Sequence, residues 1–222
     1  MERENQALRT PRAAGLAGIV FALLLGAAII LVRLAIPEDP REGGGSWFDD
    51  SSRRHTVETA LSLIPFAGIF FLWFMGAVRA RIGETEDKFF ATVFLGSGLV
   101  FVATLFGAAA AAGSLLATAD ASGTGSQQQL WSFGHHFTYS LLTTYSMRMA
   151  AVFTLSASSI GRRLGVIPRW LCLLGYLVAL TLFFVSDAIA WSELVFPTWA
   201  LVVSLYILVA SFRPRPAPSV SS

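Results

Sequence analysis

The stretch that decides the fold is FFATVFLGSGLVFVATLFGAAAAAGSLLA, residues 89–117, in which no residue carries a charge. The hydrocarbon core of a bilayer is about 30 Å thick, and a helix that rises about 1.5 Å per residue needs about 20 apolar residues to cross it. Backbone N–H and C=O groups inside lipid must be paired within the protein, which favours a helix. The stretch is therefore predicted to be a membrane-spanning helix.

Five further stretches on either side meet the same test of length and apolar content. The six predicted spans are residues 13–36, 57–78, 89–117, 136–160, 168–189 and 194–212. We expect residues 1–12 to form an N-terminal segment, residues 13–212 the transmembrane domain, and residues 213–222 a proline-rich disordered tail. The predicted fold class is all-α, a bundle of six transmembrane helices.

The composition agrees with this prediction. Of 222 residues, 55% are hydrophobic and 14% are charged, whereas soluble domains carry about 25% charged residues. The single cysteine, Cys172, excludes an internal disulfide and a multi-cysteine metal site. No phosphate-binding loop, dinucleotide fingerprint or nucleic-acid module occurs, so we expect no nucleic-acid partner. All basic residues except Lys88 are arginine, a coding bias typical of a GC-rich bacterial genome.

The positions of the basic residues predict the orientation. Eleven Lys and Arg residues fall in the N-terminal segment, in alternate loops and in the C-terminal tail, whereas the remaining loops hold three, namely Arg41, Arg53 and Arg54. Loops rich in Lys and Arg stay on the cytoplasmic side. We therefore expect both termini to be cytoplasmic, and the chain to be a multi-pass protein of a bacterial cell membrane.

The span 136–160 differs from the others because hydroxyl residues recur along it, Thr144 and Tyr145 among them, and because it contains Arg148. An arginine at mid-span costs about 2.5–3.5 kcal/mol on insertion scales. We therefore expect this helix to lie in the bundle interior or to line a hydrated cavity. Arg148 is predicted either to contact an anion or substrate, with Thr144 and Tyr145 beside it, or to form a buried ion pair.

Asp187 is the best candidate for the partner of Arg148. Counted from the basic loop that joins the two spans, the two residues differ in depth by about 6 Å at 1.5 Å per residue, which an arginine side chain can bridge. Glu58 and Glu193 sit nearer the ends of their spans and are weaker candidates.

The remaining candidate residues lie near the outer ends of the spans. His135 and His136 are adjacent, so their side chains point in different directions on a helix and do not form a zinc site of the usual spacing. We expect solvated histidines, no metal and no cofactor. Arg33 lies one turn from the end of the first span, where it can reach lipid headgroups or pair with Glu58.

Packing between the helices is predicted from small residues at four-residue spacing, which permit close approach. Residues 18, 22 and 26 form such a stripe on the first span and residues 103, 107 and 111 on the third. The second span carries Phe66, Phe70, Phe71, Trp73 and Phe74. Because these bulky residues surround the helix, we expect the second span to face lipid.

Several stretches together resemble a known group of proteins. They are PRAAGLAG at 11–18, FLWFMG at 71–76, DKFFATVFLG at 87–96, MRMAAVF at 147–153, IPRWL at 167–171 and VFPTW at 195–199. In these stretches the chain resembles a family of uncharacterised six-helix membrane proteins from actinobacteria. The resemblance implies the same six-helix topology and a bacterial source, and it implies no activity.

No catalytic constellation stands out, so three classes of function remain open. The sequence favours a non-catalytic membrane component or partner-binding subunit, which binds a membrane protein or a second copy of itself. A transporter or channel for a small solute or anion would use Arg148 on the polar span. An intramembrane enzyme is the least favoured class, because too few acid–base groups are positioned for catalysis.

Overall fold

The computed structural model describes residues 2–35, 51–82, 88–119, 126–165, 167–185, 189 and 191–212. Every element within these residues is helical, which confirms the all-α prediction. The elements are α1 (Glu2–Ala35), α2 (Ser51–Ile82), α3 (Lys88–Ala119), α4 (Ser126–Tyr139), the π-helical segment η2 (Ser140–Ser146), α5 (Met147–Arg163), α6 (Arg169–Phe184), the 3-10 helix η3 (Ser192–Leu194) and α7 (Val195–Phe212).

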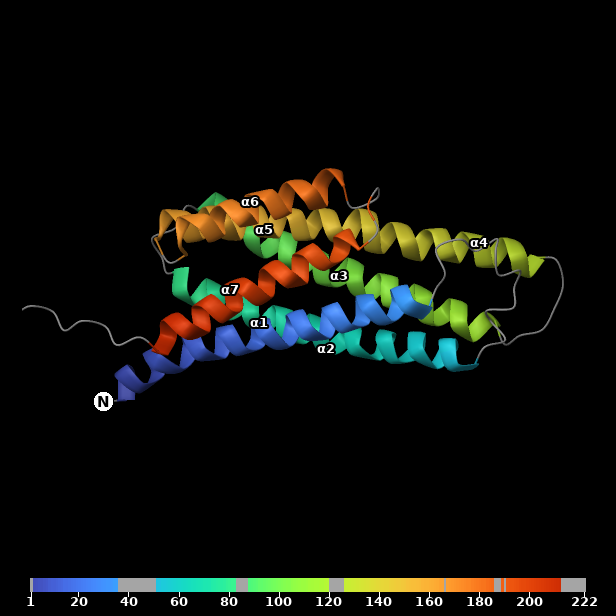
Figure 1. The fold of residues 1–222 in the computed structure, drawn as a ribbon, viewed down its shortest axis with the longest axis horizontal. Coiled ribbons are helices and arrows are strands. Elements are labelled where there is room, and N and C mark those ends of the chain that lie inside the picture. The colour runs from blue at the N-terminus through green and yellow to red at the C-terminus, as the bar shows by residue number, and fades with distance from the viewer. Residues whose placement is uncertain are drawn as a thin grey trace, which may run out of the picture.

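The described residues form six rods, as predicted. The elements α4, η2 and α5 follow one another without a break and form a single long rod, and η3 leads directly into α7. The rods lie side by side along the long axis, and the chain runs up and down between them (Figure 1). The six-helix count is therefore confirmed for this part of the chain.

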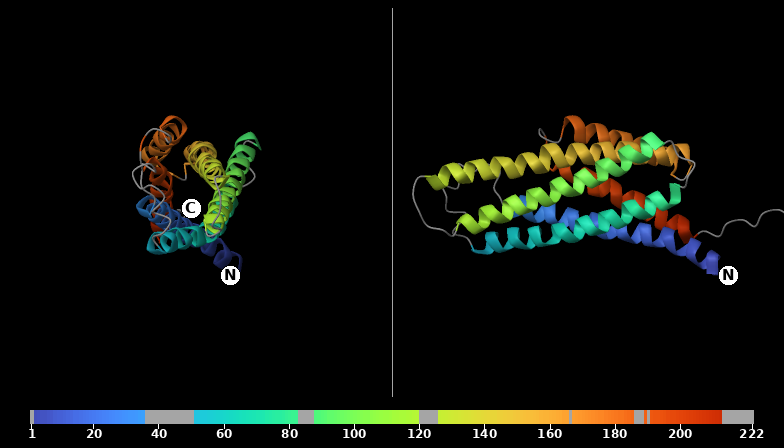
Figure 2. Two further views of the ribbon diagram at one scale, coloured as in Figure 1. Left: turned by 90° about the vertical axis from the view of Figure 1, so that its right-hand side faces the viewer. Right: turned by 180° about the vertical axis from the view of Figure 1, so that it is seen from behind.

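The packing order follows from these connections. Helix α1 packs against α2 and α7, whereas α5 packs against α3 and α6, as the end-on view in Figure 2 shows. The starts of α1, α3 and α6 gather at one end of the bundle with the ends of α2, α5 and α7 (Figure 1, left). At the other end, α4 extends beyond the end of α6 and the start of α7.

Within the described residues, four helices are long and apolar enough to cross a membrane: Arg12–Ala35, Ser51–Arg79, Phe89–Ala117 and Ser192–Phe212. Helix α6 is apolar but has only 16 residues, and it ends five residues before the predicted end of its span. The rod α4–η2–α5 is long but polar.

Phenylalanines from five helices meet at the centre of the bundle. Phe21, Phe71, Phe101, Phe153 and Phe196 are fully buried. The ring of Phe71 lies 4.8 Å from that of Phe21, 5.0 Å from Phe101, 4.9 Å from Phe153 and 6.2 Å from Phe196. The rings are tilted or edge-to-face, which is the favoured geometry for aromatic pairs. Phe71 therefore joins α2 to α1, α3, α5 and α7.

This arrangement restricts the outward-facing surface predicted for the second span to one side of the helix. Phe71 and Phe74 are buried, whereas Phe66 and Trp73 are 58% and 63% exposed. Helix α2 thus has one face in the core and one face outside. The bulky residues of this helix show no helical periodicity in the sequence, because both the buried face and the exposed face carry aromatic side chains.

Only some residues of the predicted small-residue stripes lie in close contacts between helices. At Gly18 of α1, a Cβ atom would lie 2.0 Å from Ser204 Oγ of α7, so the close approach of these helices requires glycine there. A Cβ at Gly26 would meet nothing within 4 Å. On α3, Ala103 is exposed. The first half of the α1 stripe is therefore a helix contact, whereas Gly26 and Ala103 are not packed against a neighbour in this way.

Replacing Phe71 with alanine should strongly destabilise the protein, because it removes the ring that contacts four other helices. Removal of a buried Phe side chain typically costs about 3–5 kcal/mol. Phe66→Ala on the exposed face of the same helix is the matched control, and it should change stability by about 0.5 kcal/mol or less. Thermal unfolding in detergent measures both. Equal melting temperatures for the two variants would contradict the central role of Phe71.

Candidate functional site

Hydroxyl side chains recur along the rod α4–η2–α5, and most of the buried ones are satisfied by its own backbone. Thr154 Oγ1 donates to the carbonyl of Ala150 at 2.7 Å, and Ser156 Oγ donates to that of Val152 at 2.8 Å. Such bonds to the preceding turn hide a hydroxyl in an apolar core. These residues therefore have a structural role.

The π-helical segment η2 is held against α3 by Ser146. Its Oγ atom lies 2.9 Å from the carbonyl oxygen of Leu141 and 2.9 Å from Thr104 Oγ1. Since a hydroxyl has one proton, Ser146 donates to one of these oxygens at a time. The bond to Leu141 spans five residues, the spacing of a π-helix. Single π-helical turns are frequent at functional sites, and this one directly precedes Arg148.

Arg148 and Tyr145 lie on the outer surface of the rod. Tyr145 is 58% exposed, Arg148 is also exposed, and Thr144 is half-buried. This helix was expected to lie in the bundle interior or to line a hydrated cavity, and Arg148 and Tyr145 are on its outward-facing side. The hydroxyl residues Thr143, Ser146 and Thr154 occupy the buried face instead. Asp187 lies outside the described residues, so its pairing with Arg148 stays a prediction.

Helix α4 presents aromatic residues outward. Phe133 and Phe137, one turn apart, are exposed, and their rings stack at 6.1 Å. His135 is half-buried and stacks on Tyr139, whereas His136 is exposed. Burial lowers the pKa of His135 below its usual range, and the neighbouring His136 lowers it further. His135 is therefore largely neutral at pH 7.

Two opposite charges meet where α1 ends and α7 begins. Arg33 Nη2 donates to Glu193 Oε1. Glu193 is 2% exposed and Arg33 is 23% exposed. Glu193 belongs to η3, which follows Trp191 in a left-handed backbone conformation with φ of 71°. The second carboxylate oxygen, Oε2, is buried without a hydrogen-bond partner in the structure. Arg33 is therefore the main counter-charge of a buried carboxylate.

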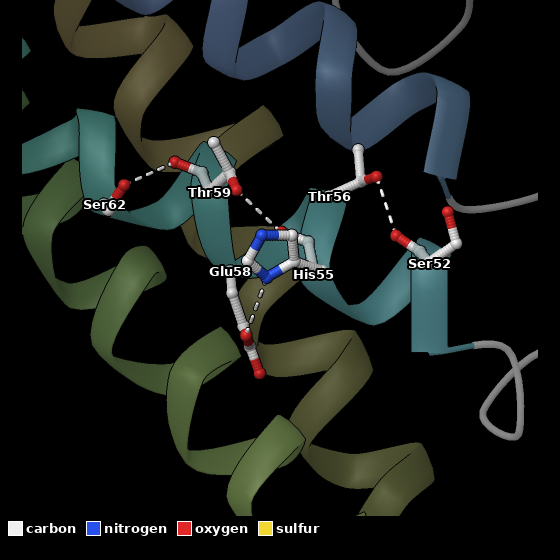
Figure 3. Close-up of polar contacts among 6 residues, drawn as sticks. All are labelled: Ser52, His55, Thr56, Glu58, Thr59 and Ser62. Carbon is white, nitrogen blue, oxygen red and sulfur yellow. Dashed lines mark hydrogen bonds and ion pairs between the residues drawn. The ribbon is translucent and has the colours of Figure 1, made fainter.

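This pair corrects the expected pairing of Arg33 with Glu58. Glu58 faces its own helix, where Oε2 lies 3.7 Å from Nδ1 of His55, and both side chains are exposed (Figure 3). Thr59 Oγ1 donates to the carbonyl of His55 at 2.8 Å. The start of α2 is thus a solvated polar surface. The sequence held a signal for the other pair, because Glu193 directly precedes a span and Arg33 nearly ends one on the same side.

The described residues contain no group of three or more His, Cys, Asp and Glu side chains that could hold a metal ion. Comparison with known protein families, curated proteins and solved structures found no match. The chemistry of the site therefore has to be inferred from its geometry. That geometry offers one buried ion pair and one outward-facing polar and aromatic surface.

Removal of Arg33 should destabilise the protein more than removal of Glu193. Arg33→Leu leaves a buried carboxylate without its counter-charge, which typically costs about 3–5 kcal/mol. Glu193→Leu leaves an arginine that is partly exposed and can reach water. We therefore expect the double variant to match Glu193→Leu in thermal unfolding. Glu58→Gln is the control and should shift stability by about 0.5 kcal/mol or less. An equal loss in Arg33→Leu and Glu58→Gln would exclude the pair.

Proposed function

We propose that this chain is a six-helix integral protein of a cell membrane, with both termini in the cytoplasm, and that it acts as a non-catalytic component that binds a membrane partner. Support for membrane insertion comes from the four long apolar helices. The side chains exposed on the bundle include many large apolar residues, such as Leu16, Leu23, Phe66, Trp73 and Leu173. An exposed apolar surface of this extent is expected for a protein that faces lipid.

The proposed orientation is supported by where arginines lie in the bundle. Arg12 near the start of α1, Arg79 near the end of α2, Arg162 and Arg163 at the end of α5, and Arg169 at the start of α6 belong to the same end of the bundle (Figure 1, left). Arg53 and Arg54 lie at the start of α2, at the opposite end. The positive-inside rule assigns the arginine-rich end to the cytoplasm.

Labelling of single cysteines tests this orientation. In a Cys172→Ser background, cysteines introduced at Ser51 and at Ser222 should behave differently in intact cells. A membrane-impermeant maleimide should label residue 51, and it should label residue 222 only after the membrane is permeabilised. Labelling of residue 222 in intact cells would contradict the proposed topology.

The observation that carries the partner-binding function is the outward position of Tyr145 and Arg148 in the middle of the bundle. Tyr145 and Arg148 are three residues apart and therefore neighbours on the helix surface. Both side chains are exposed, and both carry hydrogen-bond donors on the outer face of the rod. A partner helix with an acidic or hydrogen-bond-accepting group would match these donors. The partner proposed here is a membrane protein with such a group, or a second copy of this chain.

Helix α4 continues the same rod in the N-terminal direction. Among the described elements it packs against α3 and adjoins η2, and it leaves Phe133 and Phe137 exposed. Aromatic residues and arginine are enriched where proteins bind each other. We therefore define the partner surface by Phe133, Phe137, Tyr145 and Arg148.

The two alternative functions have less support in the geometry. A transporter that uses Arg148 would need a hydrated path to it. The bundle centre is closed by the phenylalanine cluster, and the residues that line the cavity described below are apolar and include neither Arg148 nor Thr144. An intramembrane enzyme that uses a metal ion would need a cluster of ligands, and the described residues hold no group of three or more His, Cys, Asp and Glu side chains that could bind one.

Photo-crosslinking in membranes tests the partner surface. A benzoylphenylalanine residue replaces Tyr145 in one variant and Trp73, an exposed aromatic on α2, in the control. We expect a protein adduct from position 145 and only lipid adducts from position 73. The mass of the adduct distinguishes a second copy of this chain from a different protein. Arg148→Leu should reduce the adduct from position 145. Lipid adducts alone at both positions would overturn the proposal.

A further inference from the structure

A small apolar cavity lies between the helices toward the arginine-rich end of the bundle. It has a volume of about 50 Å³, measured as the space open to the centre of a water-sized sphere. Its walls come from α1, α2, α3, α5 and α7 and include Ala14, Val78, Phe94, Ala157 and Ile207. Leu164, which also lines it, is exposed. The cavity therefore reaches the surface at the end of α5.

A water molecule in this cavity would form few hydrogen bonds. A buried water needs two to four polar partners, whereas the side chains that line this one are apolar apart from the indole N–H of Trp199. That N–H is itself buried without a hydrogen-bond partner. The chemistry of the walls matches a hydrocarbon chain, and the cavity is closed toward the centre by Phe94 and Phe153, whose rings stack at 4.7 Å.

Arginines adjoin the cavity walls on several sides. Arg79 follows the lining residue Val78, and Arg163 precedes the lining residue Leu164. The guanidinium of Arg163 lies 4.3 Å from the ring centre of Phe90, one turn before Phe94 on α3. That of Arg12 lies 4.6 Å from the ring centre of Phe212 on α7. Each of these two contacts places an arginine guanidinium against a helix that lines the cavity.

We propose that this end of the bundle is a binding site for an anionic phospholipid. One acyl chain enters the cavity past Leu164, and the phosphate lies among Arg12, Arg79 and Arg163. The occupant is a membrane lipid because an apolar cavity and several arginines occur at the same end of the bundle, the end that we place at the cytoplasmic surface. Basic pockets between membrane helices on that side are known to bind anionic headgroups.

The site goes beyond the proposed partner binding, and its test is independent of it. The partner surface lies on α4, η2 and the start of α5, whereas the lipid site lies at the opposite end of α5. Lipid binding is measured on purified protein, so it does not depend on a partner or on orientation in a cell. The lipid site rests on the proposed membrane insertion, but failure of the partner surface leaves it intact.

Native mass spectrometry of the delipidated protein tests the site with three probes that share the same acyl chains: phosphatidylglycerol, phosphatidylcholine and diacylglycerol. We expect phosphatidylglycerol to bind at least about tenfold more tightly than zwitterionic phosphatidylcholine and uncharged diacylglycerol. The double variant Arg12→Gln/Arg163→Gln should lose about tenfold or more of that affinity, because each cation near the membrane surface contributes severalfold. Arg53→Gln/Arg54→Gln at the opposite end is the matched control and should retain it.

Two variants that fill the cavity from different helices test the acyl-chain part. Ala157→Leu on α5 and Val203→Phe on α7 should each weaken phosphatidylglycerol binding, whereas Ala110→Leu on the exposed face of α3 should not. Melting temperatures measured without lipid show which of the two cavity-filling variants fold. The phosphatidylglycerol binding of a variant that folds then decides the result. Equal binding of all three probes would overturn the charge assignment. Full phosphatidylglycerol binding by a folded, filled variant would overturn the cavity assignment.

Discussion

The contact of Phe71 with four phenylalanines on four other helices is the interaction on which the rest of the structure depends. Between helices in lipid the hydrophobic effect gives little driving force, so close packing has to supply the stability. Interlocked aromatic rings provide large contact areas in fixed geometry. They also fill the centre of the bundle. The charged side chains of the described residues lie on the outer faces of the bundle or at its two ends.

The rod α4–η2–α5 shows how polar residues are accommodated around such a core. Most of its buried hydroxyls bond to carbonyl oxygens of the same rod, or to Thr104 across the contact with α3. Ser158 Oγ and Thr138 Oγ1 are buried without such a bond. Arg148 lies on the outer face. The same rod thus combines an inner face whose hydroxyls are mostly satisfied within the protein with an outer face that carries a charged side chain.

The sequence predicted the number of helices because apolar length and the spacing of charges follow directly from the thickness of a bilayer. It did not predict how each helix is rotated. In a chain where the outer face is as apolar as the core, Phe66 and Phe71 look alike, and only packing separates the exposed ring from the buried one. The partner of Arg33 was missed for a related reason: Glu58 and Glu193 both lie near the same end, and the choice depends on which helices are neighbours.

The ion pair and the glycine contacts belong to a single register of α1 on α7. A Cβ at Gly15 would lie 2.9 Å from Leu208 Cβ, and one at Gly18 would lie 2.0 Å from Ser204 Oγ. The two helices therefore run antiparallel, so later residues of α1 meet earlier residues of the η3–α7 segment. The pair of Arg33 and Glu193 continues this series of contacts. A slip of one turn would separate the charges and drive side chains into the glycine positions at once. Because Ala14 and Ile207 form part of the cavity wall, the ion pair at one end helps to set the shape of the apolar cavity toward the other.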